Sequence, residues 1–389
     1  MIKDRQQKEM LYRHFRAQGW MAQLEVPIVT ARGVSKTAPP VTDVDVLGFR
    51  PSPELKWQLV IGDCKTRRRE SPVNRVLWVR GLQEAMGAAS SIVVLQREQG
   101  AEIERDHKLF ADRLDVLLIQ EDEFGVYDRA VLYPAGSASS GESIDALDAL
   151  RVEIGAKFPA LREFVQWVMC DAWAIADHAI VLRRLLGRVR DVRGEFDPRR
   201  DDHFALILEV AAGLAIPFAT LVGQVFRGYL KPDQRGTLEE AVRVIVWGGR
   251  EQYEFYNVLR RQVLAARKGE APETLALPAW DQFLELLRAY LEAPHLSFRT
   301  PQLLRGTAVG VINGKSSDVL SRVDDRLLLH LALRLTLYLC QAAELPPDAA
   351  DRMKKLFTPR ISDVVQSHPS PAGASEEQGE LPTSRESEK

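Results

Sequence analysis

Residues 42–65 of this 389-residue chain read TDVDVLGFRPSPELKWQLVIGDCK, and this stretch decides the fold of the first third of the protein. The pattern predicts two strands, 42–50 and 57–65. A turn over 51–54 joins them, because its two prolines interrupt strand pairing. Side chains alternate along a strand, so Asp63 and Lys65 should share one face while Cys64 points to the other.

Charged side chains converge if the two strands pair as a hairpin. Asp45 of the first strand then lies near Asp63 of the second, with Lys65 beside them at one end of the sheet. An uncompensated charge is costly on an otherwise apolar surface, so such a cluster indicates a functional role.

The segments around the hairpin alternate between helical and extended patterns. We expect a helix over 3–18, a strand over 20–30, the two hairpin strands, a helix over 73–89, a strand over 90–96, a helix over 103–113 and a strand over 114–120. The late alternation of strand and helix predicts parallel crossovers. The first domain is therefore expected to be α/β with a mixed sheet.

Breaks in composition divide the chain further. We expect the α/β domain over 1–133, a Ser/Gly/Ala-rich linker over 134–145, a mainly α-helical domain over 146–364 and a disordered tail over 365–389. Helical spacing recurs over 161–179, 181–192, 204–229, 237–267, 280–290 and 326–343, with Pro198, Pro217, Pro232, Pro272 and Pro294 as dividers.

Composition narrows the class of protein. Hydrophobic residues make up 46% of the chain, which supports a substantial core, and the net charge of −2 gives no global preference for nucleic acid. The three cysteines, Cys64, Cys170 and Cys340, fit neither a disulfide framework nor a zinc site. The charged N-terminus and the interrupted apolar runs predict a soluble, cytoplasmic protein without a signal peptide or membrane span.

The αβββαβ order with Asp45 and Asp63-Cys64-Lys65 resembles the PD-(D/E)xK nuclease superfamily, which has the restriction-endonuclease-like fold. The resemblance covers about the first third of the chain, where 59–62 supply the apolar approach to Asp63. It departs from the family pattern because Val44 rather than proline precedes Asp45.

This resemblance implies roles for individual residues. Asp45 and Asp63 would bind Mg²⁺ (or Mn²⁺), a hard cation that takes oxygen ligands, and Lys65 would be the catalytic cation. Glu9 matches the acidic residue that many members carry in the first helix. Glu25 or Asp43 is the alternative source of this carboxylate, and Gln83 loosely matches a glutamine that some members use.

Basic residues near the hairpin are candidates for contacts with a phosphate backbone. Residues 1–80 contain 15 Lys/Arg against 8 Asp/Glu, and Arg67, Arg68 and Arg69 follow Lys65 directly. Arg32 and Lys36 lie in the loop that precedes the hairpin. Such clusters bind phosphates without reading sequence, although a solvated turn is an equally good interpretation of Arg67–Arg69.

Two functions remain open at this point. The first is a metal-dependent endonuclease that hydrolyses DNA, with RNA as the other substrate, whose helical domain selects the target, a partner protein or the oligomeric state. The second is a catalytically inactive restriction-endonuclease-like module that binds nucleic acid or protein.

Two other motifs carry less weight. Residues 306–317 (GTAVGVINGKSS) fail the spacing of a phosphate-binding loop. Five arginines between 183 and 193 make a basic helix, for which pairing with nearby acids is the default expectation.

Overall fold

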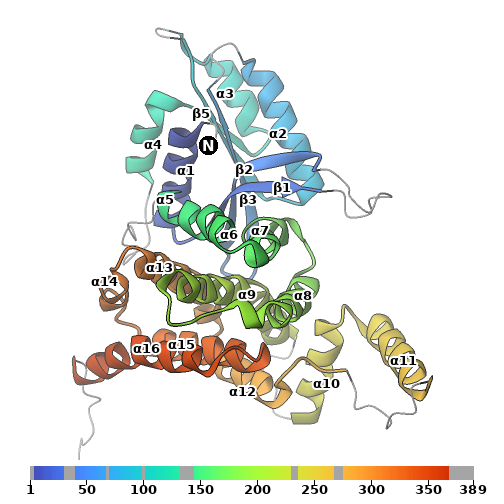
Figure 1. Ribbon diagram of the computed structural model, residues 1–389. Helices are drawn as coiled ribbons and strands as arrows, with labels where there is room; N and C mark the ends of the chain where they lie inside the picture. The colour runs from blue at the N-terminus through green and yellow to red at the C-terminus, as the bar shows by residue number, and fades with distance from the viewer. Residues whose placement is uncertain are drawn as a thin grey trace, which may run out of the picture.

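Five strands form one mixed sheet in the computed structural model, which describes residues 4–29, 40–66, 70–98, 101–131, 144–228, 235–266 and 275–367 (Figure 1). They are β1 (Met21–Ile28), β2 (Thr42–Pro51), β3 (Trp57–Lys65), β4 (Ser90–Leu95) and β5 (Val116–Gln120). Their order in the sheet is their order in the chain. β1, β2 and β3 pair antiparallel, and β3, β4 and β5 pair parallel. The predicted order of strands and helices is confirmed.

The turn between β2 and β3 begins after Pro51. The Ser52 N–H donates to the Lys56 carbonyl at 2.9 Å, and Leu55 adopts a left-handed conformation with φ of 57°. The hairpin register then runs from Pro51 opposite Trp57 to Val46 opposite Gly62. Asp45 and Asp63 are the next residues beyond that last pair.

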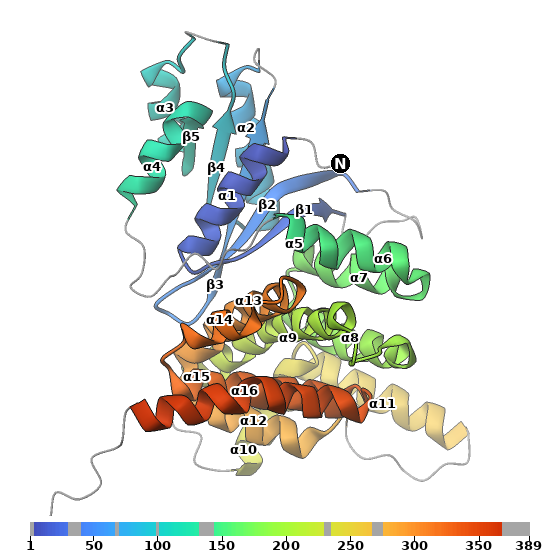
Figure 2. The ribbon, with the colours of Figure 1, turned by 60° about the vertical axis from the view of Figure 1, so that its left-hand side comes forward.

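Helix α1 (Arg5–Ala17) lies against one face of the sheet (Figure 2). It approaches closely because glycines stand beneath its apolar side chains. A Cβ at Gly48 would come 2.8 Å from Cδ2 of Phe15, and one at Gly62 would collide with Leu11. The two glycines therefore fix how near α1 sits to the ends of β2 and β3.

Helices α2 (Pro72–Met86) and α3 (Arg105–Asp112) cover the other face, against β4 and β5 (Figure 2). The Ser71 side chain accepts a hydrogen bond from the Asn74 N–H, and proline at the first helical position suits this N-terminus. Gly87, with φ of 65°, ends α2. Helix α4 (Phe124–Ala130) packs beside α1, where His14 Nδ1 lies 2.6 Å from Asp128 Oδ1.

The rest of the described chain is mainly helical. Its helices are α5 (Ile144–Asp148), α6 (Ile154–Lys157), α7 (Arg162–Met169), α8 (His178–Asp191), α9 (Asp201–Gly228), α10 (Arg235–Val246), α11 (Arg250–Ala266), α12 (Trp280–Leu291), α13 (Thr300–Ile312), α14 (Ser316–Ser321), α15 (Arg326–Ala342) and α16 (Pro347–Ser367), with short 3₁₀ and π turns between some of them.

Helix α9 is the centre of this helical region. Among the described helices it alone is long and apolar enough to cross a membrane, but 89% of its most apolar window is buried inside the protein. It packs chiefly against α13 and α8. Its hydrophobicity is accounted for by its place in the core.

Three segments of the helical pattern differ from expectation. The segment 161–179 is not one helix, because α7 ends at Met169, a 3₁₀ turn covers Asp171–Ala174 and α8 begins at His178. The segment 237–267 is two helices rather than one, because Gly248 and Gly249 adopt φ of 85° and 112° between α10 and α11. Pro217 does not divide α9, whose flanking residues are buried on both sides of it, so tertiary packing outweighs the lost backbone hydrogen bond. Residues 306–312 lie within α13, which excludes a phosphate-binding loop there.

The sheet and the helices share one hydrophobic core. The Trp57 indole donates to the Ile216 carbonyl at 3.1 Å, and the ring centroid of Phe49 lies 5.3 Å from that of Trp173. Residues 134–143 of the predicted linker and 368–389 of the predicted tail lie outside the described residues, whereas α5 begins at Ile144 and α16 continues to Ser367.

Candidate active site

Asp45 and Asp63 stand where β2 and β3 separate. Both residues are buried, with 5% and 3% of their surface exposed. Asp45 Oδ2 accepts a hydrogen bond of 2.8 Å from the Cys64 N–H, so the carboxylate replaces the backbone acceptor that β2 no longer supplies. The local separation of the strands therefore holds one carboxylate in a defined orientation.

Lys65 closes this group on the exposed side. Its Nζ lies 3.5 Å from Asp45 Oδ2 and 3.7 Å from Asp63 Oδ1, and about a quarter of the side chain is exposed. Cys64 is fully buried, as strand alternation predicts, and burial raises the pKa of its thiol well above the usual value. The sequence correctly predicted that Asp45, Asp63 and Lys65 come together.

A second lysine enters the cluster from α1. Lys8 Nζ lies 2.8 Å from Asp45 Oδ1 and also pairs with Glu25. Burial by itself would lower the pKa of Lys8, but Asp45 and Glu25 raise it further than burial lowers it. Lys8 is therefore a permanent cation between two carboxylates.

Glu25 occupies a strained position in β1. The pairs Leu24–Val46 and Val26–Val44 place Glu25 opposite Asp45, and its φ of 55° is left-handed. That conformation costs a non-glycine residue roughly 1–2 kcal/mol. Two carboxylates directly opposite each other in a sheet also repel. The Lys8 ammonium, which pairs with both Glu25 and Asp45, offsets this repulsion. Burial raises the pKa of Glu25.

Arg75 of α2 engages Asp63 from the opposite face of the sheet. Arg75 Nε donates to Asp63 Oδ2 at 2.5 Å, and its Nη2 donates to Oδ1. Burial raises the pKa of Asp63, although Arg75 acts to lower it. The Arg75 guanidinium also lies over the Trp78 ring, 3.9 Å from its centroid, and Trp78 is 39% exposed.

The other predicted site residues either contact groups outside the Asp45–Asp63 cluster or lie outside the described residues. Glu9 forms an ion pair with Arg13 at 2.7 Å, and it is the preceding residue, Lys8, that α1 presents to Asp45. Gln83 accepts a hydrogen bond from Ser91 and is buried against β4. Arg32, Lys36, Arg67, Arg68 and Arg69 lie outside the described residues.

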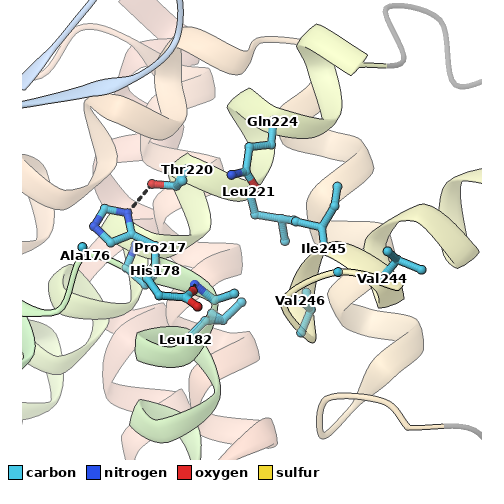
Figure 3. A pocket seen from close by; sticks show the side chains of 14 residues that line it. Ala176, His178, Leu182, Pro217, Thr220, Leu221, Gln224, Val244, Ile245 and Val246 are labelled. Atoms are coloured by element: carbon cyan, nitrogen blue, oxygen red, sulfur yellow. Dashed lines mark hydrogen bonds between the residues drawn. The ribbon is translucent and has the colours of Figure 1, made fainter. Parts of the chain in front are cut away.

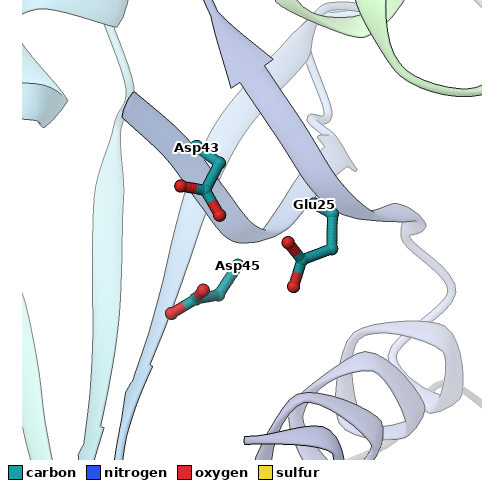
Figure 4. A group of neighbouring side chains, drawn as sticks. All are labelled: Glu25, Asp43 and Asp45. Atoms are coloured by element: carbon teal, nitrogen blue, oxygen red, sulfur yellow. The ribbon is translucent and has the colours of Figure 1, made fainter. Parts of the chain in front are cut away.

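Two sets of carboxylates fit a divalent cation by donor type. One is Asp45 with Asp63. The other is Glu25, Asp43 and Asp45, each of which offers a carboxylate oxygen within 4.8 Å of the others (Figure 4). Carboxylate oxygens are what Mg²⁺ prefers. Arg75 would compete with such an ion for Asp63, and Lys8 would compete with it for Glu25 and Asp45.

A cavity of about 480 Å³ adjoins Glu25 on the side of the helical region. Arg151, Arg162 and Gln166 line it together with Glu25. Arg151 Nη1 donates to the Leu24 carbonyl at 3.3 Å, so the helical region contacts β1 beside the cluster. No sequence pattern links these arginines to the hairpin, and the sequence did not indicate them.

A larger cavity, of about 520 Å³, lies among α8, α9 and α10 (Figure 3). His178 Nδ1 lies 2.5 Å from Thr220 Oγ1, and burial lowers the pKa of His178 to about 4, so its ring is neutral near pH 7. Asp177, which also lines the cavity, caps α8 by accepting from the Ala179 and Ile180 N–H groups. The rest of the lining is largely apolar.

The basic helix predicted over 183–193 serves structural contacts. Arg183 donates to the Val246 carbonyl and lies over Trp247, and Arg188 lies over Trp167. Arg190 and Arg193 pair with Glu344. The expected pairing with nearby acids holds for Arg190 and Arg193, whereas Arg183 and Arg188 contact a carbonyl group and tryptophan rings.

Comparisons of the chain with protein-family models, with curated proteins and with solved structures each found no match.

Proposed function

We propose that the N-terminal domain is a metal-dependent nuclease of the restriction-endonuclease-like fold, which hydrolyses phosphodiester bonds in DNA. One observation carries the proposal. Two buried carboxylates, Asp45 and Asp63, lie where two strands separate, and Lys65 Nζ is 3.5 and 3.7 Å from them. RNA is the alternative substrate, and the cytoplasm is the expected setting.

Mg²⁺ or Mn²⁺ would be held by Asp45 and Asp63, or by Asp45 with Glu25 and Asp43. When bound, the ion would activate water and stabilise negative charge on the scissile phosphate. Lys65, the partly exposed cation of the cluster, would donate to a phosphate oxygen or orient the attacking water. Glu25 would assist by pairing with Lys8, which holds the Glu25 carboxylate beside Asp45.

The helical region would contribute to substrate binding. The cavity lined by Arg151 and Arg162 lies next to Glu25, and guanidinium groups suit a phosphate backbone. A strand bound at Lys65 would extend over this cavity. Contacts of this kind give affinity that falls with salt but little sequence preference.

A second function is favoured by a specific contact. Both oxygens of Asp63 are engaged by Arg75, and Asp45 is engaged by Lys8, Lys65 and the Cys64 N–H. A site whose carboxylates are already paired with cations of the protein would also suit a catalytically inactive module that binds nucleic acid or protein. Titration with Mn²⁺ by calorimetry separates the two, since the inactive module needs no ion at Asp45 and Asp63.

The experiment that tests the nuclease proposal is a cleavage assay on supercoiled plasmid, on single-stranded DNA and on RNA, with Mg²⁺ or Mn²⁺. We expect cleavage that EDTA abolishes and that Asp63→Asn removes. Glu9→Gln is a matched control, because Glu9 is on α1 but pairs with Arg13. Cleavage of none of these substrates, or activity unchanged by Asp63→Asn, would contradict the proposal.

A further inference from the structure

Helix α11 carries a group of exposed apolar side chains unlike any other described part of the chain. Phe255, Tyr256, Val258, Leu259 and Val263 are 63%, 39%, 44%, 44% and 45% exposed. These five lie within nine consecutive residues, whereas the other exposed large hydrophobic residues are spread along the described chain. Clustered exposed apolar surface marks an interaction site more often than scattered residues do.

The apolar side chains of α11 form a single stripe. At roughly 100° per residue, Val258, Phe255, Leu259 and Val263 fall within a sector of about 140°, and Tyr256 lies at its edge. We call these five residues the α11 stripe.

The opposite side of α11 faces the protein. Asn257, which is about 180° from the middle of the stripe, accepts a hydrogen bond from the Leu275 N–H at 3.1 Å. Tyr256, at the edge, packs on Trp247 with ring centroids 5.8 Å apart. In Figure 1, α11 lies at the edge of the helical region beside α10, and the exposed fractions of the five stripe residues show that they face solvent.

Charged residues beside the α11 stripe indicate which partner binds to it. Glu254, which also lies 3.8 Å from Arg250 of its own helix, and Arg261 are both exposed and lie on the same edge, seven residues and thus about two turns apart. If two copies of α11 pair antiparallel about a two-fold axis, Glu254 of each copy faces Arg261 of the other. A parallel pair would instead place like charges together along this edge.

We propose that the α11 stripe is the interface of a homodimer in which α11 pairs antiparallel with α11 of a second copy. The helix is about 25 Å long, so it forms a small interface by itself. The dimer should therefore be of the weak, concentration-dependent class. This inference is independent of the proposed nuclease activity.

Sedimentation velocity of the full chain over a range of concentrations tests the proposal. We expect a shift from the 43.7 kDa monomer toward twice that mass as concentration rises. Phe255→Glu should abolish the shift. Leu109→Glu, which changes an exposed leucine of α3, is the matched control and should leave it intact. Circular dichroism verifies that each variant is folded.

A charge swap makes the test specific for the antiparallel arrangement. Glu254→Arg alone and Arg261→Glu alone should each weaken the dimer about tenfold or more, and the double variant should restore it. A folded wild type that stays monomeric at every concentration overturns the proposal. So does a dimer that is unaffected by Phe255→Glu, or one that the double variant fails to restore.

Discussion

Arg75 Nε donates to Oδ2 of Asp63 at 2.5 Å. A side chain of α2 therefore pairs with the β3 carboxylate that lies where β2 and β3 separate. Its Nη2 engages the other carboxylate oxygen. Because Asp63 is also a proposed metal ligand, the guanidinium and the ion compete for the same atoms. Arg75 would therefore limit how tightly an ion could bind at Asp63.

Arg75→Ala should raise the affinity for Mn²⁺ about tenfold, because the competing cation is gone. The variant should also lose about 3 kcal/mol of unfolding free energy in EDTA, since the buried Asp63 carboxylate loses its two-point partner and keeps only the more distant Lys65. Saturating Mn²⁺ should restore much of this stability. Calorimetry and urea unfolding measure both effects. Arg80→Ala, on the same helix, is the control, and an unchanged Mn²⁺ affinity in Arg75→Ala would contradict the expectation.

Lys65→Ala should lower the cleavage rate about 100-fold without weakening metal binding, because the lysine stabilises developing charge and is not a ligand. The side chain is partly exposed and each carboxylate keeps a closer cation, Lys8 or Arg75, so the unfolding free energy should change by no more than about 1 kcal/mol. Single-turnover cleavage and calorimetry measure the two properties. Lys56→Ala in the hairpin turn is a matched control. Equal cleavage by Lys65→Ala and wild type would exclude a catalytic role for this lysine.

Trp78→Ala should weaken binding of single-stranded DNA more than binding of duplex DNA. Exposed aromatic rings stack on unpaired bases, with a contribution of about 1–3 kcal/mol per base. The ring is also stacked with Arg75, so Trp78→Phe, which keeps an aromatic face, should retain most of the binding. Fluorescence anisotropy with EDTA present measures this directly. An equal loss of affinity for both substrates would indicate disturbance of α2 rather than base stacking.

The stability of the protein should fall as pH drops from about 6.5 toward 4, partly through His178. Its folded pKa is about 4, below its unfolded value, so the unfolded chain takes up a proton in this window and the folded chain does not. The loss due to His178 is on the order of 3 kcal/mol. Urea unfolding of His178→Asn should show a flatter pH dependence than wild type, and an unchanged pH dependence would contradict the expectation.

The buried pair Glu209–Arg305 should couple the sheet to the helices. The two side chains are 1% and 0% exposed, and Arg305 also donates to the Ala22 carbonyl of β1. Arg305→Met should cost about 3–5 kcal/mol, because Glu209 is left as an unpaired buried charge. Adding Glu209→Leu should recover part of the loss. Unfolding should remain a single transition, and separate transitions for sheet and helices would contradict a shared core.

The strand order and the meeting of Asp45, Asp63 and Lys65 were predictable because they depend on local patterns. Alternation along β2 and β3 sets which side chains share a face, and prolines mark the turn between them. The break between α10 and α11 had a local signal, the adjacent glycines Gly248 and Gly249. The helical spacing of apolar residues over 237–267 nevertheless favoured a single helix. Continuity of α9 through Pro217 depends on tertiary burial, which no local pattern encodes.

The cations that compensate the site were not predictable in the same way. Lys8 and Arg75 come from helices on opposite faces of the sheet, and their contacts depend on how closely each helix packs. Of the carboxylates proposed to assist the site, Glu9 pairs with Arg13, whereas the alternative Glu25 lies opposite Asp45 and pairs with Lys8. Gly48 and Gly62 are the sequence feature that would have indicated how closely α1 approaches the sheet, because a side chain at either position would collide with α1.

Cleavage of supercoiled plasmid by the full chain in Mg²⁺ or Mn²⁺, measured beside Asp45→Asn and Glu9→Gln, tests the central proposal most directly. We expect nicked and linear products from the wild type and from Glu9→Gln, and loss of at least about 100-fold in Asp45→Asn. Equal cleavage by Asp45→Asn, or no cleavage by the folded wild type with either ion, would contradict the proposed nuclease site.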